Sequence, residues 1–299
     1  MSQIVSGLSS SACACARGGD AGQDSWHYSG MCRPVLASLA ALLCACEVAV
    51  ANDVVEVGGA GTTLEGKADL VEGNAEIKVT FQPGDIDAAV TRFQLEDDRA
   101  THREVYFYDT PELTWSDAGL VLRARKTIDG ADDSTVKLRP MTAAEVDPDW
   151  FDLEGFKCEE DRVGDGAVSS CSLTMTQDQG EIDAVAAGER EVAKLFSSEQ
   201  EDFAATELGF SDWGAVVPLG PVAARVWKVS VRSLEPRLTF ELWTLPDDTR
   251  LLEVSVRVPA VDADATQEAL LAYLEARGFD ATSTGDTKTR AALDWFAGR

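Results

Sequence analysis

The chain has 299 residues, of which 45% are hydrophobic, enough for one large domain or two small domains with a buried core. It contains 52 Asp and Glu residues against 26 Lys and Arg residues, so its formal net charge is -26. This charge repels nucleic acids and anionic membrane surfaces, which argues against both as partners. A site for a polyanion must therefore be a local basic pocket.

Residues 1–51 have the pattern of an upstream segment followed by a cleaved signal peptide. Arg33 precedes an apolar run over 35–46, and small residues at 49 and 51 form a cleavage site. The run is shorter than the about 20 residues of a bilayer span. We expect a start at Met31, cleavage after Ala51 and export to the periplasm. The alternatives are a buried apolar helix and, less favoured, a lipoprotein anchored through Cys46.

Cysteine usage agrees with export. Five of the 7 Cys residues precede residue 52, which leaves Cys158 and Cys171 in the mature chain. An even pair in an exported chain predicts one disulfide, here closing a polar loop, and the alternative is two free thiols. His102 is the one histidine after the cleavage site, so a His/Cys metal site or a Ser-His-Asp triad is not expected.

The mature chain is predicted to consist mainly of strands. Residues 52–73 are glycine-rich and are expected to form a flexible lead-in to a domain over 74–299. Alternation or β-branched and aromatic content predicts strands at 74–81, 105–110, 120–126, 134–140, 225–232, 237–245 and 250–258. A turn signal at 246–248 makes the last two a hairpin.

Helices are predicted between these strands. Residues 86–93 have helical spacing, and a helix near 264–277 is expected to begin with a capping box of Asp264 and Gln267 and to end at Gly278. Residues 141–222 are expected to form an acidic insertion, a loop around the two cysteines that becomes helical over 181–203.

The polar faces of the predicted strands carry an unexpected charge. Several have two bases on one face, opposite an apolar face: Arg123 with Arg125, Lys137 with Arg139, and Lys228 with Arg232. A half-buried antiparallel sheet with one solvated side explains any single strand. In a chain with twice as many acids as bases, however, the repeated pattern favours a sheet curled around an anion, with helices on its outer face. The nearby Glu76 and Glu253 would suit a hard divalent ion.

These segments together resemble the CYTH, or triphosphate tunnel metalloenzyme, superfamily. The resemblance rests on "NAEIKVTF", "YFYDTPELTWSDAGLVLRARK", "STVKLRP", "LLEVSVRV" and "TGDTKTR", and runs from about Asn74 to the C-terminus around the insertion. It implies an α+β fold, an antiparallel β-barrel that forms a tunnel, with covering helices. It also implies that a phosphorylated small molecule or polyphosphate is bound in the tunnel and hydrolysed with Mg or Mn. Cyclisation of ATP, also found in the family, is disfavoured because export removes the chain from ATP.

The resemblance assigns roles residue by residue. The E-x-E-x-K motif of the family corresponds to Asn74, Glu76 and Lys78, and its later E-x-E strand to Glu253 and Ser255. Glu76 and Glu253 would then be the catalytic and metal-binding carboxylates. The expected phosphate-binding residues are Lys78, Arg123, Arg125, Lys137, Arg139, Lys228 and Lys288.

Two departures from the family pattern fall on the metal side. Asn74 and Ser255 stand where the family has carboxylates, so they would be weak metal ligands. Three functions therefore stay open: a metal-dependent triphosphatase, a non-catalytic anion-binding module, and a structural protein on the same fold.

Overall fold

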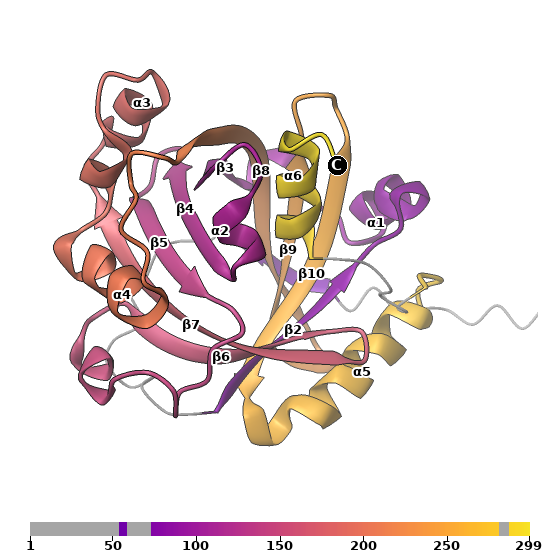
Figure 1. The fold of residues 1–299 in the computed structure, drawn as a ribbon. Coiled ribbons are helices and arrows are strands. Elements are labelled where there is room, and N and C mark those ends of the chain that lie inside the picture. The colour runs from indigo at the N-terminus through magenta and orange to yellow at the C-terminus, as the bar shows by residue number, and fades with distance from the viewer. Residues whose placement is uncertain (1–53, 59–72, 281–286) are drawn as a thin grey trace, which may run out of the picture. The chain divides into compact units, whose positions relative to one another are not determined.

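A computed structural model of the chain describes residues 54–58, 73–280 and 287–299. The predicted signal peptide, the start at Met31, Cys46 and the beginning of the mature chain near Asn52 lie outside these residues. Ten strands form one sheet (Figure 1). They are β1 (Val54–Gly58), β2 (Asn74–Thr80), β3 (Thr101–Asp109), β4 (Leu120–Thr127), β5 (Asp132–Leu138), β6 (Phe156–Val163), β7 (Gly166–Gln177), β8 (Val217–Val231), β9 (Leu234–Thr244) and β10 (Arg250–Pro259).

Nine of the strands close into a barrel. Their order is β8-β3-β4-β5-β7-β6-β2-β10-β9, and β9 pairs back onto β8, while β1 adds to β8 outside the ring. The α+β barrel expected from the resemblance is confirmed. One pair differs, because β2 and β6 are parallel whereas all other pairs of the described strands are antiparallel. β7 lies between β5 and β6 and is antiparallel to both, so β5 and β6 run in the same direction. This is also the direction of β2.

Two hydrophobic clusters lie on the outer face of the barrel. In the first, apolar residues of β2, β8, β9 and β10 pack against α1 (Ile86–Arg92) and α5 (Ala263–Glu275). In the second, β4, β5 and β7 pack against α3 (Glu181–Ala186) and α4 (Ser198–Leu208). The apolar faces of the strands therefore point outward, under helices, as the alternation predicts, and the polar faces line the interior.

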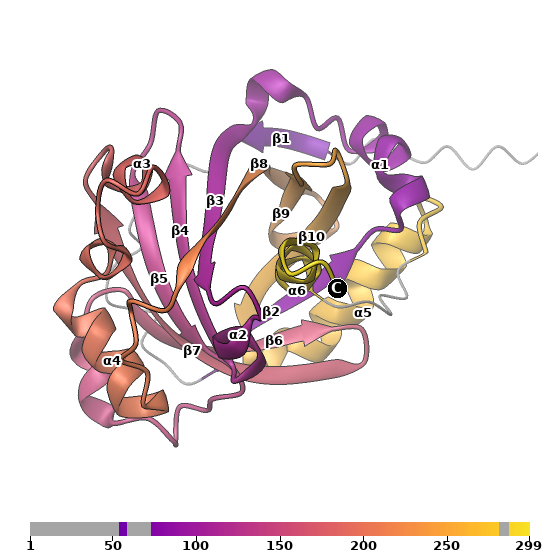
Figure 2. The same ribbon diagram turned by 45° about the horizontal axis from the view of Figure 1, so that its top comes forward.

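A third cluster fills one end of the barrel from inside. The C-terminal helix α6 (Lys288–Phe296) lies within the ring of strands in Figure 2. Its Ala292 and Leu293 are buried against Val105, Phe107 and Trp243, which are inward residues of β3 and β9. The polar cavity therefore occupies the remaining part of the interior.

The segment 141–222 contributes to the barrel itself. Its helices α3 and α4 agree with the helical part of the prediction, but its cysteines lie in two strands, β6 and β7, and not in a loop. Cys158 and Cys171 face each other in register and form the predicted disulfide, with their Cα atoms 4.0 Å apart. Alternation did not show β6 because charged residues occupy both of its faces.

The start of α5 also differs from the prediction. The helix begins at Ala263, and Asp264 forms an ion pair with Arg162 and not a cap. Gln267 donates to the carbonyl of Gly164, 2.9 Å away, so these two polar residues connect the helix to the β6–β7 hairpin. In the part of the chain that the structure describes, no helix is long and apolar enough to cross a membrane.

Candidate anion and metal site inside the barrel

A cavity of about 580 Å³ lies inside the barrel. Eleven basic and four acidic side chains line it among the described residues, so its charge balance is opposite to that of the whole chain. The predicted site residues on its wall are Glu76, Lys78, Arg123, Arg125, Lys137, Arg139, Lys228, Glu253, Ser255 and Lys288. Asn74 is not among the lining residues.

Several lining residues did not emerge from the sequence. They are Arg103 on β3, Lys157 and Glu159 on β6, Glu241 on β9, Arg257 on β10 and Arg290 on α6. Lys157 and Glu159 lie in the segment that was expected to be a loop. Glu241 alternates with Thr239 on the inward face of β9, but a single acid does not stand out in a chain with 52 acidic residues.

A buried aspartate positions the strand that carries the two arginines. Asp109 ends β3, and its carboxylate accepts hydrogen bonds from the backbone N–H groups of Thr110, Trp115 and Ser116 at 2.7, 3.0 and 2.7 Å. These bonds fix the turn into the short helix α2 (Thr114–Asp117), which leads into β4. Gly119 follows with φ +95°, and a Cβ atom there would lie 2.4 Å from the carbonyl oxygen of Arg139. Only glycine suits this approach of chain to chain.

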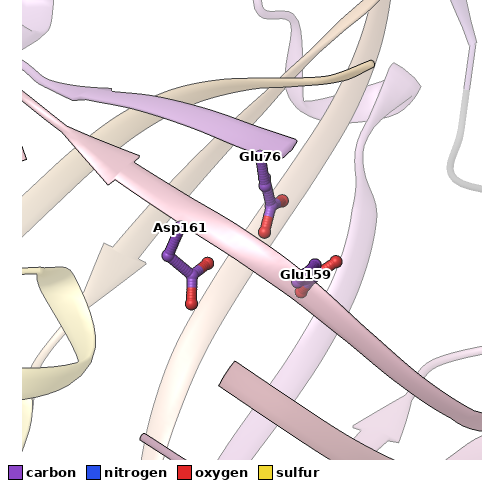
Figure 3. A group of neighbouring side chains, drawn as sticks. All are labelled: Glu76, Glu159 and Asp161. Carbon is purple, nitrogen blue, oxygen red and sulfur yellow. The ribbon is translucent and has the colours of Figure 1, made fainter. Parts of the chain in front are cut away.

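A group of three carboxylates lies on β2 and β6. Oxygen atoms of Glu76, Glu159 and Asp161 lie within 4.8 Å of one another, and Figure 3 shows these side chains. Asp161 is fully buried and accepts from Lys78 at 2.6 Å and from Lys137 at 2.7 Å. The hydroxyl of Ser170 also donates to it, at 3.0 Å.

Basic side chains surround the other two carboxylates as well. Glu76 lies 3.0 Å from the ammonium group of Lys78, and Glu159 lies 2.7 Å from Lys157 and 3.1 Å from Arg257. The group of carboxylates is therefore already paired with four cations.

The ion pairs keep these carboxylates charged despite their burial. Burial raises the pKa of Asp161, but the neighbouring Lys78 and Lys137 outweigh it and hold this pKa far below the usual range. The pKa of Glu76 is lowered in the same way, against its burial, chiefly by Lys78. Burial alone would lower the pKa of Lys78, yet Glu76 and Asp161 raise it.

The arginines on the β3 and β4 side are in a different state. Arg125 donates from Nε to both oxygens of Asp133, at 2.9 and 3.0 Å. The Nε atoms of Arg103 and Arg123 are buried and have no hydrogen-bond partner among the described residues. Burial, and then the charge of Arg125, lower the pKa of Arg123 to about 10. This part of the wall therefore has excess positive charge.

A third group connects α6 to the barrel wall. Glu241 and Glu253 are direct partners in the β9–β10 register, and the ammonium group of Lys288 contacts both, Glu253 at 2.9 Å. The indole N–H of Trp243 donates to Glu241 at 2.8 Å. Burial opposes ionisation of Glu241, but Lys288 lowers its pKa to about 2. The predicted phosphate ligand Lys288 thus neutralises two carboxylates.

The carboxylates that lie together are not the pair named from the sequence. Glu76 is in the group, but its neighbours are Glu159 and Asp161, whereas Glu253 contacts Lys288. Ser255 lies opposite Lys78 and Thr239 in the register, and Asn74 lies opposite Glu159. All-oxygen ligands of this kind suit Mg or Mn.

Comparison by sequence gives no relative: no protein-family model matches this chain, and no curated protein matches it. Comparison by structure gives several. The putative adenylyl cyclase HpAC1 from Hippeastrum, described as having a dominant triphosphatase activity, superposes with a TM-score of 0.55 at 15% identity. The match covers 74% of this chain and 96% of HpAC1.

A second similar structure is a putative adenylate cyclase from Bacillus halodurans. Its TM-score is 0.52 at 12% identity, and the match covers 73% of this chain and 98% of the other. At these identities the likeness establishes the fold, and the chemistry has to be argued from the residues in the cavity.

Proposed function

We propose that this chain, which has the triphosphate tunnel fold of CYTH proteins, binds a triphosphate or polyphosphate anion inside the barrel and hydrolyses it with a divalent ion. The charge of the cavity supports this proposal most directly. Eleven basic side chains line it in a chain of net charge -26, and such an inversion is expected for a site that selects anions. The activity described for HpAC1 agrees with the same chemistry.

The basic residues would have different tasks. Arg123 has a guanidinium group without an ion pair among the described residues, and its planar fork matches two phosphate oxygens. Arg125 is held in position by Asp133. Arg139 and Lys228 supply further charge on the wall. The ammonium groups of Lys78 and Lys137 already donate to Asp161, so in this arrangement they would contact phosphate only through their remaining N–H groups.

A metal ion would be held by Glu76, Glu159 and Asp161. Their oxygen atoms lie close enough to share one ion, and the donor set is the type that Mg or Mn prefers. The ion would neutralise phosphate charge and favour attack by water. Lys78 and Lys137 occupy the same oxygens, so metal binding requires these ammonium groups to turn toward the phosphate.

That competition supports an alternative, a module that binds the anion without hydrolysing it. The carboxylates are already neutralised by lysines, and Ser255 brings no charge to the wall. Under this alternative the ligand is captured by the arginines and Lys228. Phosphate release from tripolyphosphate, measured with and without Mg or Mn, distinguishes the two functions.

We also propose that the protein acts outside the cytoplasm, in the periplasm. The disulfide between Cys158 and Cys171 supports this compartment, because such bonds persist in oxidising environments.

The most direct test is a thermal-shift screen with phosphates of increasing length, with and without Mg or Mn. The proposal expects a rise in melting temperature that grows from phosphate to tripolyphosphate. Equal melting temperatures with all phosphates, in the presence and absence of metal, would refute anion binding and leave a structural role for the fold.

Arg123→Ala should weaken tripolyphosphate binding about ten- to a hundredfold, because a charge-assisted hydrogen bond contributes roughly 1.5–3 kcal/mol. Its stability should change little, since Arg123 has no ion pair among the described residues and is repelled by Arg125. Isothermal titration calorimetry and urea denaturation measure the two quantities. Unchanged affinity combined with a large loss of stability would show that Arg123 is structural.

A further inference from the structure

Arg103 is a cavity residue to which neither the sequence pattern nor the resemblance gives a role. It lies near the start of β3, opposite Thr127 of β4 and Ala224 of β8 in the register. Its side chain lines the cavity, and its Nε atom is buried and finds no hydrogen-bond partner in the described part of the chain. No ion pair holds Arg103 among the residues that the structure describes.

The charges around Arg103 are unbalanced. Burial, and then Arg125, lower its pKa, and Arg103 in turn lowers the pKa of Arg123. Two carboxylates act on it from a distance, Asp133 and Glu241, and both are engaged elsewhere. Asp133 accepts from Arg125, and Glu241 from Lys288 and Trp243.

Such an arrangement is costly without a ligand. Burying a charged group without a partner destabilises a protein, and three guanidinium groups with one paired carboxylate add mutual repulsion. A tetrahedral oxyanion removes both penalties, because each of its oxygens can accept from a guanidinium N–H. The lysine-rich side of the cavity does not have this deficit, since its cations are paired with Glu76, Glu159 and Asp161.

We infer that Arg103 is a phosphate-binding residue, and that it forms with Arg123 a subsite that holds one phosphoryl group without a divalent ion. This inference rests on the proposed function and deepens it. The two halves of the cavity then differ in their requirements. The arginine half binds phosphate by charge alone, and the carboxylate half responds to Mg or Mn.

The test uses Arg103→Met, which removes the charge and keeps an unbranched apolar side chain. Arg225→Met is the matched control, because it removes the same charge outside the cavity. Arg225 lies on the face of β8 that points away from the cavity, and it pairs with Asp97. Tripolyphosphate binding to the full chain is measured in EDTA by calorimetry. We expect Arg103→Met to raise the Kd about ten- to a hundredfold, and Arg225→Met to leave it within about twofold.

The melting temperature without ligand is the second readout. Because Arg103 is unpaired and repelled, Arg103→Met should melt at or above the temperature of the unmodified protein. A clear fall in this temperature would make Arg103 a structural residue and overturn the inference. If Arg103→Met does not fold, Arg103→Lys replaces it, and we expect Lys to retain part of the affinity.

The possible outcomes distinguish a failure of this inference from a failure of the proposed function on which it rests. If the unmodified protein binds tripolyphosphate only with Mg or Mn, or if Arg103→Met binds it as tightly in EDTA, the inference fails while the proposed function stands. If the unmodified protein binds no phosphate under any condition, the proposed function fails as well.

Discussion

Asp161→Asn should lower the free energy of unfolding by about 3–5 kcal/mol, the range found when one partner of a buried ion pair is removed. Asp161 is fully buried and is the shared acceptor of Lys78, Lys137 and Ser170. Asparagine keeps the shape but not the charge, so Lys78 and Lys137 lose the buried counterion that they share and keep only Glu76 and Glu159 beside them. Urea denaturation in EDTA at pH 7 measures the change.

Asp264→Asn is the control for this prediction. Asp264 also pairs with an arginine, Arg162, but its side chain is 93% exposed. Exposed pairs contribute less than about 1 kcal/mol, so this variant should unfold close to the unmodified protein. Equal effects of the two substitutions would contradict the role of Asp161 as the centre of the buried network. Asp161→Asn, unlike the control, should also lose stabilisation by Mg or Mn, since Asp161 would be one of the three metal ligands.

Lys288→Met is the second change with a large expected effect. It leaves Glu241 and Glu253 facing each other across β9 and β10 without a cation. Like charges directly opposite in a sheet are destabilising, and here both lie on the wall of the cavity inside the barrel. We expect a loss of about 3–5 kcal/mol at pH 7. Arg290→Met, on the same helix, removes a partly exposed pair with Asp117 and Asp294 and should cost less than about 1 kcal/mol.

The pH dependence of the two proteins should have opposite signs. In the unmodified protein the pKa of Glu241 is lowered to about 2, so its stabilisation is complete above the unfolded pKa of about 4.3 and is lost as the pH falls toward 2. In Lys288→Met burial and the facing Glu253 both disfavour the charged form of Glu241, so Glu241 takes up a proton and stability rises as the pH falls from 7 toward 5. Melting curves of both proteins across pH 3–8 test this prediction. The same dependence on pH in both would contradict the pairing of Lys288 with Glu241 and Glu253.

The sign of charge on alternating faces predicts a sheet curled around an anion, and the resemblance predicts that this sheet is a barrel. Arg123 with Arg125, and Lys137 with Arg139, identify inward faces because bases are scarce in this chain, and those side chains do line the cavity. The same reasoning fails for β6, where Glu159 and Asp161 point inward but Glu160 and Arg162 on the other face are charged too. Without a contrast between faces, alternation gives no signal.

The sequence also does not show which residues far apart in the chain come together in the fold. The sequence predicts Glu76 as a metal ligand but not the two carboxylates beside it, because the parallel pairing of β2 with β6 brings together residues more than 80 positions apart. It also supplied Lys288 but not the fact that α6 lies inside the ring. An amphipathic helix shows which of its faces is buried and does not show which side of a sheet it will cover.

The helix inside the barrel also bears on how a long ligand would thread. Ala292 and Leu293 seal the interior against Val105, Phe107 and Trp243, so within the described residues that end is filled by packed side chains. A linear phosphate polymer could then insert only its tip, and its middle would stay outside. We therefore expect any turnover of polyphosphate to proceed stepwise from a terminus, releasing small units and leaving the remaining polymer long, as an exo-acting enzyme does.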